Sequence, residues 1–250
     1  MTVQALRPPK ERTRRFLMRR WNEMPNATLT TFSIVARCPQ SGELGVAVST
    51  AIPAVGAINP FARAQVGAVA TQAWSNPYLG IDGLHLLAGG LSAAEVLERL
   101  LKTDADREKR QLSIVDAHGG VAAFTGNAVQ PWKGHCEGKG YVVAGNLLVS
   151  DETILAMAES FEATRGPLAE RLMAALEAGQ AAGGDRRGKV SAALLVVGDE
   201  EYPHLDLRVD EHTDPVAELR RIFDLYTALP YLDDLHPKRT WYQEGKGFEL

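Results

Sequence analysis

Short runs of β-branched, aromatic and small apolar residues recur along the chain from Thr30 onward. Such runs predict β-strands where turn residues bound them. They cover residues 31–37, 44–50, 66–72, 112–115, 121–124, 141–144, 190–197 and 205–209. Pro39, Ser41 and Gly42 separate the first two runs, which therefore predict a hairpin. The run 66–72 is almost wholly small and apolar, so we expect it to be buried on both faces.

Apolar residues at helical spacing lie between these runs. Ser92 and Glu95 form a capping box ahead of one predicted helix. Two further helices are expected over about 151–163 and 167–178, and a last one over about 214–226. The order along the chain is strands, two helices, strands, two helices, strands and a helix.

Segregated strands and helices indicate an α+β domain rather than an alternating parallel one. We expect two stacked, mainly antiparallel sheets, flanked by a helix pair on each outer face. The runs 66–72 and 190–197 would then lie between the sheets. This domain is predicted to span residues 30–230, with a surface tail over 231–250.

Residues 1–29 form a basic N-terminal arm of different character. Its first 23 residues carry seven arginines and lysines against two glutamates. We expect this arm to be disordered or weakly helical, or to be removed. The alternative is an amphipathic anchor whose apolar face holds Phe16, Leu17 and Trp21.

The composition excludes several classes of protein. With 45% hydrophobic and 23% charged residues, the chain of 250 residues resembles an ordinary globular protein. The net charge of −4 gives no bulk attraction to nucleic acid or anionic lipid. No apolar run reaches the roughly 20 residues that cross a bilayer. We therefore expect a cytoplasmic protein that binds neither nucleic acid nor membrane.

The sequence lacks the usual motifs for binding zinc, a dinucleotide or a phosphate group. Cys38 and Cys136 are the only cysteines, too few for a thiolate zinc site. Two reduced thiols are the favoured interpretation, and a single disulfide is the alternative. The six histidines include no pair at i, i+4, and no glycine run forms a dinucleotide or phosphate loop. No metal and no cofactor are therefore predicted.

Six segments together resemble a known family. They are residues 31–37, 42–48, 66–72, 123–126, 145–148 and 183–188. They resemble a bacterial family catalogued as domain-of-unknown-function family 1028, which is grouped with the N-terminal nucleophile (Ntn) hydrolases. The resemblance covers about residues 30–225 and implies a four-layer αββα sandwich of hydrolase ancestry. It implies no substrate.

In the Ntn superfamily, the first residue of the first strand is the nucleophile, so the resemblance points to Thr31. The free α-amine of such a residue has a pKa of about 7.7–8.0 and can accept the hydroxyl proton. Thirty residues precede Thr31, however, so cleavage at Thr30–Thr31 would be needed. The alternative is that Thr31 is simply a β-branched residue that opens a strand. Ser33, on the same face, is the reserve nucleophile and a candidate substrate contact.

The supporting candidates come from later segments. Asn146 could donate its amide to an oxyanion, or could serve only in a turn. Asp185 and Ser191 match residues that steady the terminal amine in threonine-type Ntn enzymes. Arg187 could bind a substrate carboxylate, and Gln72 could line the pocket. The alternative for the segment around Asp185 is a solvated glycine-rich loop.

These residues lead to one hypothesis and one rival. The first is an amidohydrolase that cleaves a C–N amide bond of a small metabolite, with Thr31 as nucleophile and base. The rival is a non-catalytic Ntn-fold subunit for ligand binding or assembly, which the residues ahead of Thr31 favour. Paired sheets of this kind commonly form homo-oligomers, and the sequence leaves the oligomeric state open.

Overall fold

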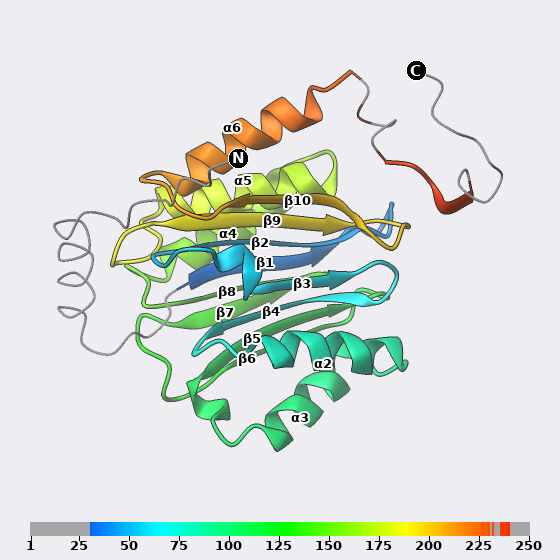
Figure 1. Cartoon of the computed structure of the whole chain (residues 1–250). Coiled ribbons are helices and arrows are strands. Elements are labelled where there is room, and N and C mark those ends of the chain that lie inside the picture. The colour runs from blue at the N-terminus through cyan, green and yellow to red at the C-terminus, as the bar shows by residue number, and fades with distance from the viewer. Residues whose placement is uncertain (1–30, 231, 233–235, 241–250) are drawn as a thin grey trace, which may run out of the picture.

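The computed structural model describes residues 31–230, 232 and 236–240 (Figure 1). The predictions for the arm over 1–29 and for most of the tail over 231–250 concern residues outside these ranges. Within the tail, the Tyr202 hydroxyl donates to the carbonyl of Pro237 at 2.8 Å, so this part of the tail lies on the domain.

Six strands form the larger sheet. In spatial order they are β10 (Pro203–Val209), β9 (Ser191–Val197), β2 (Leu44–Thr50), β1 (Thr31–Arg37), β8 (Tyr141–Asn146) and β7 (Gly134–Gly138). All neighbouring strands are antiparallel. The first strand is therefore an interior strand, with hydrogen-bonded neighbours on both sides.

Four strands form the smaller sheet, again with antiparallel neighbours. In spatial order they are β3 (Pro60–Arg63), β4 (Gly67–Ala73), β5 (Arg110–Asp116) and β6 (Val121–Thr125). Short 3-10 helices lie between β2 and β3, at Val55–Ala57, and between α3 and β5, at Arg107–Lys109.

Five α-helices accompany the sheets in the described part of the chain. They are α2 (Pro77–Ala88), α3 (Ala93–Thr103), α4 (Glu152–Ala163), α5 (Leu168–Ala181) and α6 (Pro215–Thr227). None of these helices has the length and apolar character to cross a bilayer. The predicted capping box is confirmed, because Glu95 accepts a hydrogen bond from the Ser92 backbone at 2.8 Å.

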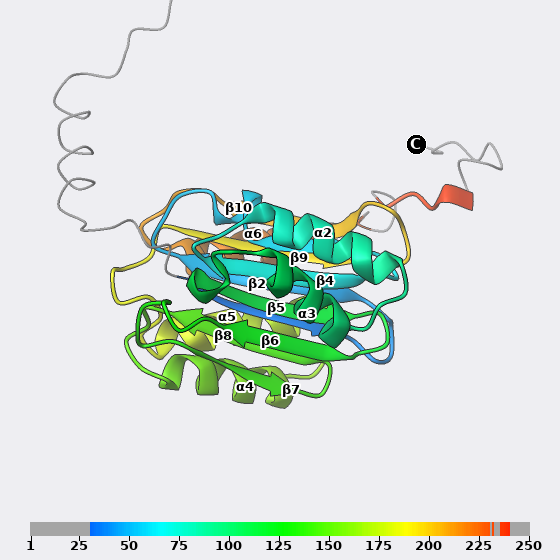
Figure 2. The same ribbon diagram turned by 90° about the horizontal axis from the view of Figure 1, so that it is seen from below.

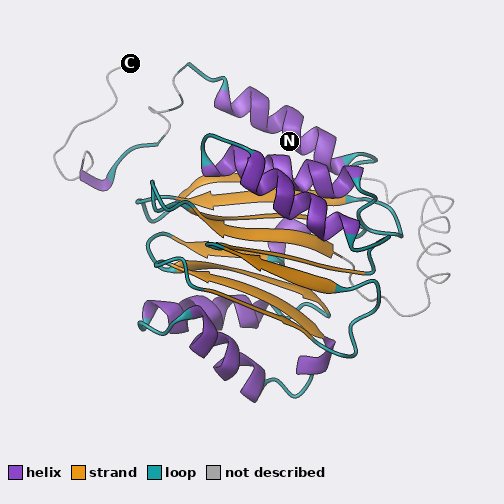
Figure 3. Ribbon diagram, turned by 180° about the vertical axis from the view of Figure 1, so that it is seen from behind, coloured by secondary structure: helices purple, strands orange, loops and turns teal. Residues whose placement is uncertain are grey.

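The two sheets pack face to face, and helices cover their outer faces. Val35 and Val46 of the larger sheet meet Ala70 and Val115 of the smaller one in a buried cluster. Helices α2 and α3 pack on the smaller sheet (Figure 2), and α4, α5 and α6 pack on the larger one (Figure 3). The predicted α+β class with two antiparallel sheets is confirmed.

Both faces of the larger sheet are buried, which explains the continuous apolar runs in the sequence. Phe32 and Ile34 face the helices, whereas Val35 faces the smaller sheet. Helix α5 lies very close to strand β2 at Gly45, where a Cβ atom would lie 2.6 Å from Leu172 Cδ1 of α5. The absence of a side chain at this position lets α5 rest directly on β2.

A third helix on the larger sheet departs from the expected helix pairs. Arg220 of α6 donates to Glu177 and Glu170 of α5, at 2.8 Å to the nearest oxygen of each. Hydrogen bonds to these carboxylates raise the pKa of Arg220 above its ordinary value. This charged contact joins α6 to α5. The larger sheet therefore carries three helices and not the predicted pair.

Three elements were not located from the sequence. Strand β7 contains two glycines and alternates half-buried with exposed residues at a sheet edge, so it carries little apolar signal. Strand β3 has four residues and begins with a proline. Helix α2 contains two glycines, which weaken helix propensity. The run 190–197 lies only partly between the sheets, because Leu194 and Val196 face the helices.

We expect the contact between α5 and the larger sheet to dominate stability. Leu172 is fully buried, so Leu172→Ala should lower the free energy of unfolding by about 2–5 kcal/mol. Leu225→Ala on α6, where the side chain is 60% exposed, is the matched control and should change it by less than about 0.5 kcal/mol. Urea denaturation measures both, and equal effects would contradict this assignment of the core.

Candidate functional site

A row of polar residues crosses four neighbouring strands of the larger sheet at one end. Thr31 pairs with Asn146 on one side and Thr50 on the other, and Thr50 pairs with Ser191. Directly paired residues of antiparallel strands point to the same face. Since Val35 of the same strand faces the smaller sheet, the whole row faces it as well.

Thr31 lies at the centre of this row as the first residue of β1. Its side chain is buried, and its hydroxyl donates to the Thr50 hydroxyl at 3.3 Å. The pairing of β1 with β2 and β8 holds the Thr31 backbone on both sides. A nucleophile at this position would therefore have a fixed backbone and a hydroxyl neighbour.

Asn146 adjoins Thr31 at the end of β8. Its amide nitrogen donates to Gln111 Oε1 at 3.0 Å and to the carbonyl of Thr31 at 3.5 Å. The second bond is at the limit of hydrogen-bond length and is the weaker one. The chain turns directly after this residue, since Leu147 has a φ of 49°.

Side-chain amides join the two sheets beneath the polar row. The Ser33 hydroxyl donates to Gln72 Oε1 at 2.7 Å, and Gln72 Nε2 donates to Gln111 Oε1 at 2.8 Å. Gln111 Nε2 in turn donates to the Thr125 hydroxyl and to the carbonyl of Gly145, both at 2.9 Å. Ser33 and Gln72 are thus placed as links between the sheets, each with a buried partner.

Asp185 lies just beyond the row, in the segment between α5 and β9. Its carboxylate accepts from the backbone N–H of Ala51 at 3.1 Å and of Arg187 at 2.9 Å. The guanidinium of Arg187 also lies against this carboxylate, at 3.4 Å. The side chain of Asp185 is almost fully buried and anchors the segment to the end of β2, whereas Gly183, Arg186 and Gly188 of the same segment are exposed.

Ser191 closes the row on β9 and holds a neighbouring turn. Its hydroxyl donates to the carbonyl of Ile52 at 2.6 Å and accepts from the N–H of Val55 at 3.1 Å. Both partners belong to the segment after β2. The hydroxyl therefore shapes the wall beside Thr50, and neither bond reaches Thr31.

The predicted site residues thus gather at one end of the two sheets, in the row or directly beside it. Their catalytic and substrate-binding roles remain predictions. Gln111, which accepts hydrogen bonds from both Gln72 and Asn146, was not among the predicted residues, because its only signal in the sequence is a polar residue beside the run 112–115. In the described part of the chain, no three His, Cys, Asp or Glu side chains are grouped to hold a metal ion.

We expect Gln111 to be needed for the geometry of this end. Gln111→Leu leaves the buried amides of Gln72 and Asn146 without their acceptor, so it should cost about 1–3 kcal/mol of unfolding free energy. The control is Gln130→Leu, because Gln130 is exposed. Thermal and urea unfolding measure the difference. A Gln111→Leu protein as stable as the control would show that the amide links are not needed.

Comparisons with known proteins identify a family and a similar solved structure from it. The sequence model of a family described as of unknown function (DUF1028) matches residues 31–219. A solved protein of Silicibacter pomeroyi from that family is 32% identical, with a TM-score of 0.76. The match covers 82% of this chain and 92% of that chain.

A more distant similarity is to Anbu, an ancestral beta-subunit from Yersinia bercovieri. It has 11% identity and a TM-score of 0.37, over 80% of this chain and 98% of that one. No curated protein matches this chain.

Proposed function

We propose that this chain, which belongs to the family of unknown function DUF1028, is an Ntn-type amidohydrolase. The observation that carries the proposal is the polar row centred on Thr31, at the start of an interior strand. Further support comes from two face-to-face antiparallel sheets with helices on both outer faces, the layering expected of an Ntn αββα sandwich.

In the proposed reaction, cleavage before Thr31 first releases its α-amine. That amine accepts the proton of the Thr31 hydroxyl, and the hydroxyl oxygen attacks the amide carbonyl of the substrate. The C–N bond then breaks, the departing nitrogen takes the proton, and an ester to Thr31 remains. Water, deprotonated by the same amine, attacks the ester and releases the acid, which restores the hydroxyl.

The neighbouring residues have separate tasks in this proposal. Asn146 stabilises the negative charge on the carbonyl oxygen with the hydrogen that it now shares weakly with the Thr31 carbonyl. Asp185 holds the chain after β2 and supplies negative charge near the ammonium form of the amine. Thr50 orients the Thr31 hydroxyl, and Ser191 fixes the wall beside it.

The proposed substrate is specified only by the bond that is cleaved and by its charge. We propose a C–N amide bond of a small metabolite, with Arg187 close enough to the site to favour a carboxylated substrate. Arg187 lies against Asp185, so a substrate carboxylate would share this guanidinium with it.

One observation favours a second candidate function, a non-catalytic subunit for ligand binding or assembly. Thr31, Ser33 and Asn146 are each at most 2% exposed, which leaves little surface for a substrate to contact. A hydrolase needs this end to open when the chain before Thr31 is cleaved. A non-catalytic subunit can function with this end of the sheets closed.

Labelling with an electrophile distinguishes the two functions. A β-lactone probe acylates an activated hydroxyl, so we expect one covalent adduct, mapped by peptide mass spectrometry to Thr31. Thr31→Ala should reduce labelling by at least about 100-fold, because it removes both the hydroxyl and its intramolecular base-assisted attack. Thr31→Ser should still be labelled.

Ser33→Ala keeps the Thr31 hydroxyl and should still be labelled at Thr31. An adduct that survives Thr31→Ala but disappears in Ser33→Ala would move the nucleophile to Ser33. No adduct in any variant would contradict the hydrolase and leave the non-catalytic subunit. Circular dichroism on each variant checks that the fold is retained.

A further inference from the structure

The opposite end of the two sheets contains a pocket that the proposed reaction does not use. Its volume is about 520 Å³, within the usual range for small-molecule sites. Arg37, at the end of β1, lines it, whereas Thr31 begins the same strand. Six residues of extended chain separate the two by about 20 Å, so the pocket is distinct from the polar row.

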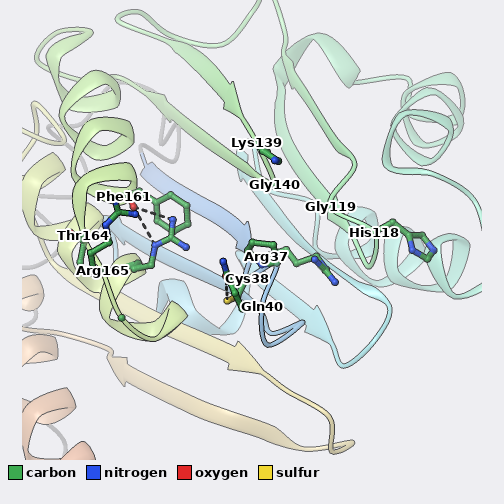
Figure 4. A pocket seen from close by; sticks show the side chains of 13 residues that line it. Arg37, Cys38, Gln40, His118, Gly119, Lys139, Gly140, Phe161, Thr164 and Arg165 are labelled. Carbon is green, nitrogen blue, oxygen red and sulfur yellow. Dashed lines mark hydrogen bonds between the residues drawn. The ribbon is translucent and has the colours of Figure 1, made fainter.

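Three separate parts of the chain bring positively charged side chains to this pocket, and a fourth brings His118. Arg37 comes from β1, His118 from the β5–β6 turn, Lys139 from the β7–β8 turn, and Arg165 and Arg171 from the α4–α5 region. In Figure 4, Arg37, Lys139 and Arg165 lie on different sides of the pocket, and the Arg37 side chain extends toward the side of His118. Among the described residues, no Asp or Glu lines the pocket, although the whole chain has a net charge of −4.

Three of these cations have no partner among the described residues. Neither an ion pair nor a side-chain hydrogen bond is present there for Arg37, Lys139 or Arg165, and the buried Nε of Arg37 lacks an acceptor. Clustered cations repel one another, and a buried guanidinium N–H without a partner costs free energy. An anion in the pocket would relieve the repulsion.

Neither Glu162 nor Glu43, two carboxylates close in sequence to the pocket residues, forms an ion pair with a pocket cation among the described residues. Glu162 accepts a hydrogen bond from the Tyr141 hydroxyl at 2.7 Å, and Glu43 accepts one from the Ser41 hydroxyl at 2.8 Å. Arg171 is held in place, since it donates to the carbonyl of Phe161 and stacks 4.0 Å from the centroid of that ring. The pocket therefore combines one positioned arginine with cations that lack a carboxylate partner.

We propose that this pocket binds a small polyanion that carries phosphate or carboxylate oxygens. Arginine donors suit both groups, because the planar guanidinium forms two parallel hydrogen bonds to either. Several cations approaching from different strands and loops favour a ligand with two or more negative charges. A phosphorylated metabolite and a polycarboxylate share this chemistry, and separate probes distinguish them.

Isothermal titration of the full chain tests the site, with inorganic pyrophosphate and citrate as probes at constant ionic strength. At least one probe should bind with a dissociation constant below about 1 mM. Arg37→Gln combined with Arg165→Gln should weaken that binding at least about tenfold, because each arginine loses a charge-assisted hydrogen bond. Binding of pyrophosphate alone identifies a phosphate site, and binding of citrate alone identifies a carboxylate site.

Arg99→Gln, an exposed arginine on α3, is the control for loss of charge and should leave the affinity unchanged. Thr31→Ala should also bind normally, so failure of the hydrolase proposal would leave this result intact. No binding of either probe would overturn the proposal. It would also be overturned if the double variant bound as well as the unaltered chain, or no more weakly than the Arg99 variant.

Discussion

The two sheets pack face to face although polar side chains lie between them. The geometry of the site follows from how these side chains are hydrogen-bonded. Buried polar groups require hydrogen-bond partners, and here Gln111 provides them. It accepts from Gln72 and Asn146 and donates to the carbonyl of Gly145, so it joins the smaller sheet to the larger one. Toward the other end the same interface is apolar, with Val35 against the strands of the smaller sheet. The interface thus has a polar end and an apolar interior.

This division assigns different chemistry to the two ends of β1. At its start, Thr31 lies among uncharged hydroxyl and amide groups that are fixed by both sheets. At its other end, Arg37 belongs to a cationic pocket made by turns and a helix connection. A rigid interior strand keeps the two ends apart, since every residue of β1 except Arg37 is buried. The hydrolase and the anion site are therefore separate proposals about one scaffold.

Much of the fold could be predicted from local patterns, and the misses have physical causes. The capping box of Ser92 and Glu95 and the hairpin around Gly42 depend on neighbours in sequence, so the sequence alone indicates them. The edge strand Gly134–Gly138 was missed because it buries little apolar surface and pairs on one side only. Of the candidate site, the pattern and the resemblance pointed to Thr31 and Asn146. Gln111 could not be predicted, because its partners are distant along the chain and only the packed sheets bring them together.

The proposed mechanism requires Thr31 to become a free N-terminus. Intact mass and N-terminal sequencing of the protein purified from its native host test it most directly. The proposed mechanism predicts a mature chain that begins at Thr31, whose free α-amine is then available as the base. A purified protein that keeps residues ahead of Thr31 would have this amine tied up in a peptide bond and would contradict the proposed mechanism.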